Sequence, residues 1–135
     1  MGISEKVVFL GSIPNAKMPR LYQQHDLFVS ATAQEGMSNA MLEAMASGLP
    51  IVTTRCEGVD ELIGDNGIVV EESSAGAIAE AIKKVLCDAK TYRQMSIAAR
   101  QRAKAFSWKR IAEKYFEIYL KTANPVPKSQ KCCVS

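Results

Sequence analysis

Two glutamates, Glu35 and Glu43, flank the start of a stretch that is otherwise almost wholly apolar. Ser38 or Asn39 can cap a helix there, and Gly48-Leu49-Pro50 ends it. A segment this rich in Ala, Met and Leu is normally buried, so a glutamate inside it needs a partner. This demand makes Glu43 a candidate functional residue.

The start of this helix predicts an anion site, because free N–H groups and the positive end of the helix dipole lie near Gly36 to Asn39. Glu43 lies roughly 7 Å along the axis from Ser38, at ~1.5 Å per residue, on the face shared with residues 36, 39 and 40. A phosphate at the helix end therefore brings a sugar hydroxyl against Glu43. The arrangement indicates a nucleotide-diphosphate sugar, with ribose at Glu43 and the second sugar near Glu35.

Short β-branched runs alternate with helical stretches, which favours a parallel sheet with flanking helices. Pro19 suits the first turn of a helix that continues to about Gln24. A short helical turn is expected at 59–63, and Asp65-Asn66-Gly67 predicts a tight turn. The candidate strands are Val7–Leu10, Leu27–Ala31, Ile51–Thr54 and Ile68–Val70.

From Ser73 onward the chain is predicted to be helical. Ser73 or Ser74 can cap a first helix, a second runs from about Lys90 to Phe106, and Ser107 caps a third that reaches about Lys121. We expect a disordered tail over 122–135. The apolar faces comprise Ile78, Ala81, Ile82, Val85 and Leu86 on the first helix, and Trp108, Ile111, Ala112, Tyr115, Ile118 and Tyr119 on the third.

The order and spacing of five segments resemble the donor-binding domain of the retaining glycosyltransferases of family four, which have the GT-B fold. The resemblance runs from about Val7 to Leu120. Its most specific part is the pair Glu35 and Glu43 followed by the sequence up to Val52. The similar segments are Val8-Phe9-Leu10-Gly11, Asp26–Ala31, Glu35–Val52, Thr53–Gly58 and Glu61-Leu62-Ile63.

The resemblance implies an α/β fold, a Rossmann-like parallel sheet with flanking helices that is a truncated half of a GT-B fold. Residues 1–121 would form part of the C-terminal domain that binds the donor nucleotide sugar. In the resembled family, two further β-α units and an N-terminal acceptor-binding domain precede this region. We therefore expect a piece of a longer enzyme, inactive as a hexosyltransferase by itself, whose partners are the nucleotide-diphosphate sugar and that acceptor domain.

The resemblance also implies roles for the site residues. Glu43 would accept hydrogen bonds from the ribose hydroxyls. Glu35 would contact the transferred sugar as the catalytic residue, and backbone N–H groups after it would bind the distal phosphate. No metal or other cofactor is expected, since the helix dipole and basic side chains replace it, and UDP-sugars are the favoured donors for polysaccharide or related biosynthesis. The donor-binding residues so implied are Gly11, Glu35, Gly36, Met37, Ser38, Asn39 and Glu43.

Other interpretations stay open. A non-hydrolysing nucleotide-sugar epimerase also needs carboxylates near a bound UDP-sugar, and a non-catalytic nucleotide-binding or interaction module needs no catalysis. As a structural alternative, Glu43 forms a salt bridge with a core arginine while Glu35 lies on the surface. A glycosidase pair is disfavoured because one carboxylate lies inside a helix. The loop at 56–61 departs from the family's two glycines and proline, and its Glu57 would bring negative charge near the diphosphate.

The formal net charge of +3 is spread without a dense basic run, so nucleic acid is not an expected partner. Four cysteines without metal-ligand spacing favour a reduced, cytoplasmic location, with peripheral contact at the inner face of a membrane as an alternative. Cys132 begins a C-a-a-X prenylation box, although plain tail cysteines are the simpler interpretation. His25, the one histidine, suits a surface position. The other cysteines are Cys56, Cys87 and Cys133.

The last helix yields a prediction about self-association. In the resembled fold this helix crosses back toward the N-terminal domain, so we expect the face with Trp108, Tyr115 and Tyr119 to have lost part of its cover. Exposed apolar patches of this kind promote association. This chain should therefore dimerise or aggregate more than the full enzyme. Size-exclusion chromatography at rising concentration checks this, and strictly monomeric elution at high concentration would contradict it.

Overall fold

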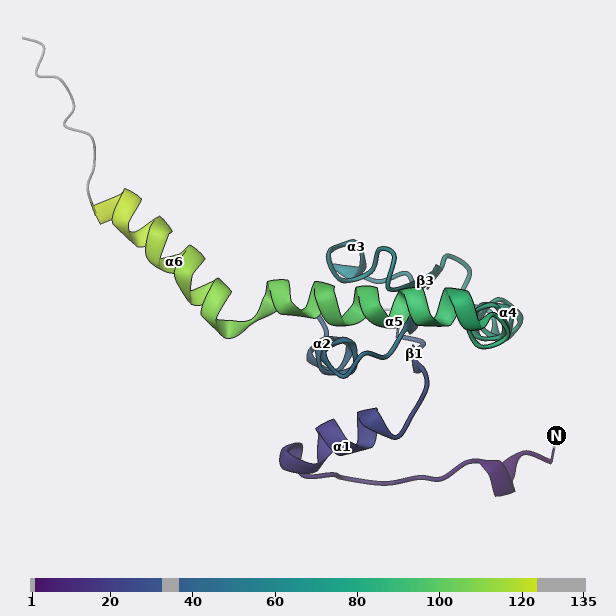
Figure 1. Ribbon diagram of the computed structural model, residues 1–135. Helices are drawn as coiled ribbons and strands as arrows, with labels where there is room; N and C mark the ends of the chain where they lie inside the picture. Colours follow the sequence, from purple (N-terminus) through teal and green to yellow (C-terminus); the bar gives the residue numbers. More distant parts are fainter. Residues whose placement is uncertain (1, 33–36, 124–135) are drawn as a thin grey trace, which may run out of the picture. The chain divides into compact units, whose positions relative to one another are not determined.

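A computed structural model describes residues 2–32 and 37–123 of the chain (Figure 1). Its contacts divide the chain into two compact units, Met1–Lys104 and Ala105–Ser135. The first unit holds a parallel sheet with flanking helices, and the described part of the second is mostly one helix. The predicted α/β class with a parallel sheet is therefore confirmed.

The sheet contains three parallel strands in the order β1-β2-β3. They are β1 (Phe28–Ser30), β2 (Ile51–Thr54) and β3 (Gly67–Val70), which confirms three of the four predicted strands within a residue or two at each end. All four residues of β2 are buried, as expected for a strand with neighbours on both sides and helices on its faces.

The fourth predicted strand, Val7–Leu10, is wrong: these residues form no strand, and Phe9 is 93% exposed. The β-branched and aromatic run has the composition of a strand. However, a strand forms only where a neighbouring backbone supplies donors and acceptors. Within the described residues β1 pairs with β2 alone, so this segment does not add to the outer edge of β1 and forms no ladder hydrogen bonds.

Two helices of the first unit, α2 and α4, begin at serines that the sequence predicts as caps. Ser38 precedes α2 and Ser74 precedes α4, and each hydroxyl accepts a backbone N–H, from Met41 and Ala77 respectively. These helices are α1 (Met18–Gln23), α2 (Asn39–Ala46), α3 (Val59–Leu62), α4 (Ala75–Leu86) and α5 (Ala89–Ala103). Short 3₁₀ turns lie at η1 (Ser4–Lys6), η2 (Asn15–Lys17) and η3 (Lys104–Phe106).

One core cluster lies between the sheet and α4, and consists of Val52, Val70, Ala81 and Val85. The predicted face of α4 is therefore largely right, but Leu86 is 49% exposed because it is the last residue of the helix. Helix α5 packs against both α2 and α4 (Figure 1). Helix α5 thus contacts both α2, which carries Glu43, and α4, which covers the sheet.

In the second unit, α6 spans Trp108–Ala123, and its Ser107 cap is confirmed by a hydrogen bond from the Arg110 N–H to the Ser107 hydroxyl at 3.4 Å. The side chains of Trp108, Tyr115 and Tyr119 are exposed, as expected for the face described above. The tail beyond residue 123, with Cys132, lies outside the described residues. Within the described ranges, no helix is long and apolar enough to cross a membrane.

A buried asparagine fixes the turn between α3 and β3. The Asn66 side chain accepts the Gly64 N–H at 2.8 Å and donates to the Leu62 carbonyl at 3.2 Å. The main-chain carbonyl of Asn66 accepts the Ile51 N–H at 3.2 Å, which joins this turn to the start of β2. The predicted Asp65-Asn66-Gly67 turn is therefore also a link between strands.

Gly67 supplies a stability test. A Cβ at this position would lie 2.3 Å from the Ile51 carbonyl oxygen, so the paired strands must separate to admit it. Gly67→Ala should lower the free energy of unfolding by about 1 to 3 kcal/mol, the usual cost of overpacking. Gly76→Ala is the matched control, since nothing lies within 4 Å of its added Cβ and helix propensity favours alanine. Urea denaturation should give opposite signs; equal effects would contradict this account.

Candidate functional site

The start of α2 is held in place by its cap. Ser38 is buried with an extended backbone, and its hydroxyl accepts the Met41 N–H at 3.4 Å, so Ser38 and not Asn39 is the cap. Met37 and Asn39 are exposed on either side of it. Glu35 and Gly36 lie outside the described residues. The described residues of the predicted anion site therefore include two on an accessible surface, Met37 and Asn39.

The segment leading to Glu35 is tied to the central strand. The Thr54 hydroxyl, at the carboxyl end of β2, donates to the Thr32 carbonyl at 2.7 Å. Thr32 follows β1 and is the last described residue before Glu35 in the sequence. In open α/β sheets, ligands bind at the carboxyl ends of the strands. This hydrogen bond fixes the position of Thr32 at that edge.

Glu43 is exposed, which corrects the expectation that it is buried in an apolar helix. The apolar residues of α2 lie on one side, where Met41, Ala44 and Met45 are buried. A helix repeats every 3.6 residues, so Glu43 falls on the opposite side with Asn39. Exposure removes the need for a salt bridge, and none joins Glu43 to an arginine within the described residues; its hydrogen bond comes from the Tyr22 hydroxyl at 3.3 Å.

Tyr22 connects Glu43 to the core. Its ring is buried near Phe28, with centroids 6.3 Å apart. Burial raises the pKa of Tyr22, and the charge of Glu43 raises it further, so the phenol stays protonated and remains a donor at neutral pH. The hydroxyl contacts one carboxylate oxygen, Oε2, which leaves Oε1 for other donors. Sequence reasoning missed Tyr22, because the contact joins α1 to α2.

A cavity of about 320 Å³ lies beside this pair. It is within the lower part of the volume range of small-molecule sites, roughly 300–1,000 Å³. Its lining combines the Glu43 carboxylate and the Tyr22 ring with one arginine from α5. The lining residues are Asn15, Met18, Pro19, Tyr22, Gln23, Glu43, Ala46, Ser47 and Arg100.

An ion network lies at the carboxyl edge of the sheet. Arg55 directly follows β2; its Nε donates to Glu71 Oε2 at 2.9 Å, and its guanidinium also contacts Glu71 Oε1 and Asp60. Hydrogen bonds from these carboxylates raise the pKa of Arg55, and Arg55 lowers the pKa of Glu71. Sequence reasoning missed Arg55, although its place immediately after a strand marks it as an edge residue. Glu57, in the departing loop, is exposed.

The remaining candidates lie apart from these contacts. Gly11 is exposed with φ of 63°, a conformation that favours glycine, and its donor-binding role stays a prediction. His25 is on the surface as expected, with its Nδ1 2.7 Å from the Leu21 carbonyl. Cys56 and Cys87 are free thiols. Among the residues that the structure describes, no three His, Cys, Asp or Glu side chains are grouped as a metal site.

Comparison with known proteins gives the family. A family model described as glycosyl transferases group 1 matches residues 1–88, more than half of the chain, and the chain belongs to that family. It is 31% identical over 121 residues to the D-inositol 3-phosphate glycosyltransferase of Corynebacterium diphtheriae. That alignment covers 88% of this chain and 28% of the relative, so the chain spans less than a third of that protein.

Solved structures agree with the fold. The sucrose-phosphate synthase of Thermosynechococcus elongatus superimposes with a TM-score of 0.80 and 28% identity, over 90% of this chain and 32% of that one. The C-terminal domain of a glycosyl transferase group 1 family protein from Francisella tularensis gives 0.68 and 27% identity, over 77% of this chain and 55% of that one. These neighbours are GT-B glycosyltransferase domains, as the sequence resemblance implied.

The Arg55 network predicts a specific acid sensitivity. Arg55 holds the pKa of Glu71 below its ordinary value of 4.5, so ionised Glu71 stabilises the fold above that pH. This contribution is lost as the pH falls from 4.5 to the lowered pKa. Glu71→Gln should therefore make the free energy of unfolding fall less steeply below pH 4.5 than it does in the unmodified chain.

Chemical denaturation at a series of pH values measures this slope. Glu72→Gln is the matched control, because the neighbouring Glu72 is exposed and forms no ion pair within the described residues. Equal slopes for the two variants would contradict a stabilising role for the Arg55–Glu71 pair.

Proposed function

We propose that this chain is the donor-binding part of a retaining glycosyltransferase of family four. The enzyme moves a sugar from a nucleotide-diphosphate sugar, a UDP-sugar by preference, to a glycan, lipid or other acceptor. The observation that carries the proposal is the arrangement on α2, with a capped helix start and Glu43 on the exposed face. Membership of the glycosyl transferases group 1 family supports the reaction class. The acceptor domain belongs to the longer protein of this proposal.

Glu43 binds the ribose in this proposal. Its exposed position gives the two ribose hydroxyls access to the carboxylate, and a charged acceptor makes stronger hydrogen bonds than a neutral one. Tyr22 contacts one carboxylate oxygen from the buried side and so restricts the rotation of the side chain. A preorganised carboxylate loses less conformational entropy when the nucleotide binds.

The start of α2 stabilises the leaving group. The N–H groups near Met37, Ser38 and Asn39 bind the distal phosphate, together with Gly36. Glu35 contacts the transferred sugar and stabilises positive charge at its anomeric carbon. The bond from that carbon to phosphate breaks, a bond to the acceptor oxygen forms, and the acceptor's proton leaves with the diphosphate. Helix-end electrostatics of this kind act where negative charge develops.

A nucleotide-binding module without catalysis is the second candidate. The specific observation in its favour is that Arg55, a cation at the carboxyl edge of the sheet, is already paired with Glu71 and Asp60. A guanidinium neutralised in this way offers less charge to a diphosphate. This candidate shares nucleotide binding with the first but has no transferase activity.

Nucleotide binding tests the proposal directly. The isotope-labelled chain is titrated with UDP, GDP and ADP, and backbone amide shifts are followed by NMR. We expect one nucleotide to shift the amides from Glu35 to Glu43. Glu43→Ala should weaken this binding about tenfold or more, because charged hydrogen bonds to the ribose are lost, and Tyr22→Phe roughly threefold.

Glu72→Ala is the matched control, since it removes an exposed carboxylate away from α2 and should leave the affinity unchanged. Uridine, guanosine and adenosine, which lack phosphate, separate ribose and base contacts from phosphate contacts. Nucleotide shifts that avoid α2, or that persist equally in Glu43→Ala, would contradict the proposed donor site.

A further inference from the structure

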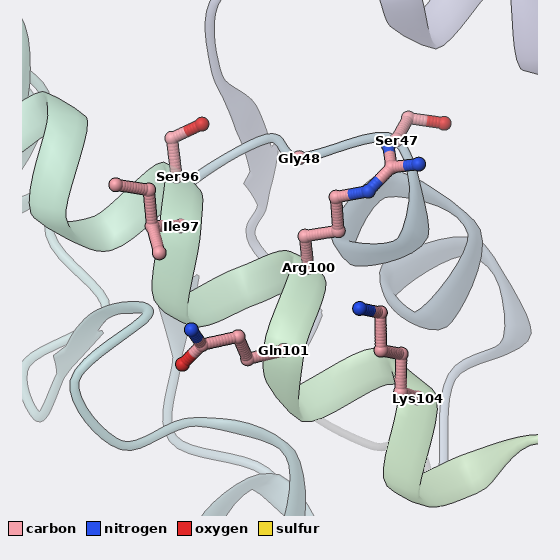
Figure 2. Close-up of a pocket in the computed structure, with 7 residues that line it drawn as sticks. All are labelled: Ser47, Gly48, Ser96, Ile97, Arg100, Gln101 and Lys104. Atoms are coloured by element: carbon pink, nitrogen blue, oxygen red, sulfur yellow. The ribbon is translucent and has the colours of Figure 1, made fainter.

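A second cavity lies between the end of α2 and the last two turns of α5, and Figure 2 shows the side chains around it. Its volume is about 380 Å³, which is sufficient for a small organic ligand. It is lined by Ser47, Gly48, Ser96, Ile97, Arg100, Gln101 and Lys104. All of these belong to the first unit, so the cavity is complete within one body of the chain.

The lining is basic and rich in hydrogen-bond donors. Arg100 and Lys104 are one helical turn apart, and like charges at this spacing repel each other. Within the described residues neither forms an ion pair, and no carboxylate lines the cavity. The hydroxyls of Ser47 and Ser96 and the Gln101 amide add neutral donors. A ligand that carries several acceptor oxygens and negative charge would satisfy them together.

The helix dipole explains only part of this composition. Cations are favoured in the last turn of a helix such as α5, whatever lies beside it. The dipole does not account for hydroxyl groups from two different helices around the same space. Figure 2 shows the Arg100 side chain reaching toward Ser47, with Lys104 on the same side of α5. The side chains of Arg100, Gln101 and Lys104 are exposed, so their donors are accessible to a dissolved ligand.

The framework around the cavity is fixed. Gly48 has φ of 87°, and a Cβ there would lie 3.6 Å from the Ser96 hydroxyl oxygen, so the end of α2 approaches α5 closely. Its N–H donates to the Met45 carbonyl at 2.9 Å. On α5, Ala98 and Ala99 are buried. The positions of the two serine hydroxyls therefore depend on packed backbone and not on a free loop.

We propose that this cavity binds the phosphate group of a small, free phosphate monoester. Arg100 and Lys104 neutralise the dianion, and the hydroxyls of Ser47 and Ser96 donate to its oxygens. Guanidinium groups suit phosphate because they offer paired donors in one plane. Ser47 lies nine residues beyond Ser38, roughly 13 Å along α2 at ~1.5 Å per residue. The site is therefore distinct from the anion site at the start of that helix.

The probe for the test is inorganic phosphate, added to the labelled 135-residue chain with ionic strength held constant by sodium chloride. We expect saturable shifts at the amides of Gly48, Ser96, Gln101 and Lys104. The variant with Arg100→Gln and Lys104→Gln should bind at least about tenfold more weakly, the effect of losing one charged hydrogen bond or more. The same titration with glucose 6-phosphate asks whether the cavity also accepts the attached sugar, which should raise the affinity.

The matched control carries Lys84→Gln and Arg93→Gln, which remove the same charge from exposed positions of α4 and α5 outside this cavity. It should bind phosphate as the unmodified chain does. Equal weakening in both double variants, or shifts that never saturate, would overturn the proposal in favour of general charge attraction. Binding only to vesicles that contain phosphatidic acid, with no response to free phosphate, would also overturn it, because the ligand would then be a lipid headgroup.

Two further measurements separate this site from the donor site. Glu43→Ala should leave the phosphate shifts intact while it weakens nucleotide binding. The single variant Lys104→Gln should weaken phosphate binding and retain uridine binding, since Lys104 does not line the cavity beside Glu43 and uridine has no phosphate. If the unmodified chain binds phosphate but no nucleoside, the proposed function is contradicted. If it binds a nucleoside but no phosphate, this inference is contradicted.

Discussion

The central strand β2 is the constraint on which the rest of the structure depends. Its four residues are buried, and it is the strand with a parallel neighbour on each side. Its first residue, Ile51, lies so close to β3 that a side chain at position 67 would collide with the Ile51 carbonyl oxygen, so glycine is required there. Its last residue, Thr54, holds the Thr32 carbonyl, and the next, Arg55, holds Glu71. One strand therefore fixes the positions of Thr32 and Glu71 at the carboxyl edge of the sheet.

Helix α2, which follows β1 in the chain, has two chemically different ends. Its start is capped by Ser38, whose hydroxyl accepts the Met41 N–H, and has Met37 and Asn39 exposed on either side. Its other end, at Ser47 and Gly48, meets the cationic stripe of α5. Arg100 and Ser47 line both this end and the cavity beside Glu43. Because the two proposed sites share these residues, nucleosides without phosphate are needed to assign contacts to one site or the other.

Local sequence patterns were sufficient for the elements and their caps. Serines before apolar periodic runs marked the starts of α2 and α4, and β-branched runs marked all three strands. The errors involve partners distant in sequence. Val7–Leu10 has the composition of a strand but pairs with none of the described strands, and the contact of Tyr22 with Glu43 spans 21 positions. The Arg55–Glu71 pair arises because parallel strands end at one edge, and that pairing is a property of the sheet.

The exposure of Glu43 also changes the physical argument for its role. A carboxylate buried among Met and Ala side chains would need a cation as partner, because its charge is costly to remove from water. On the exposed face, desolvation costs little, and the Tyr22 hydroxyl orients the group without neutralising it. A neutral donor from the core and an open second oxygen are what reversible binding of a ribose requires. The apolar composition of α2 therefore serves packing, with contacts to α5, while its polar face with Glu43 is exposed.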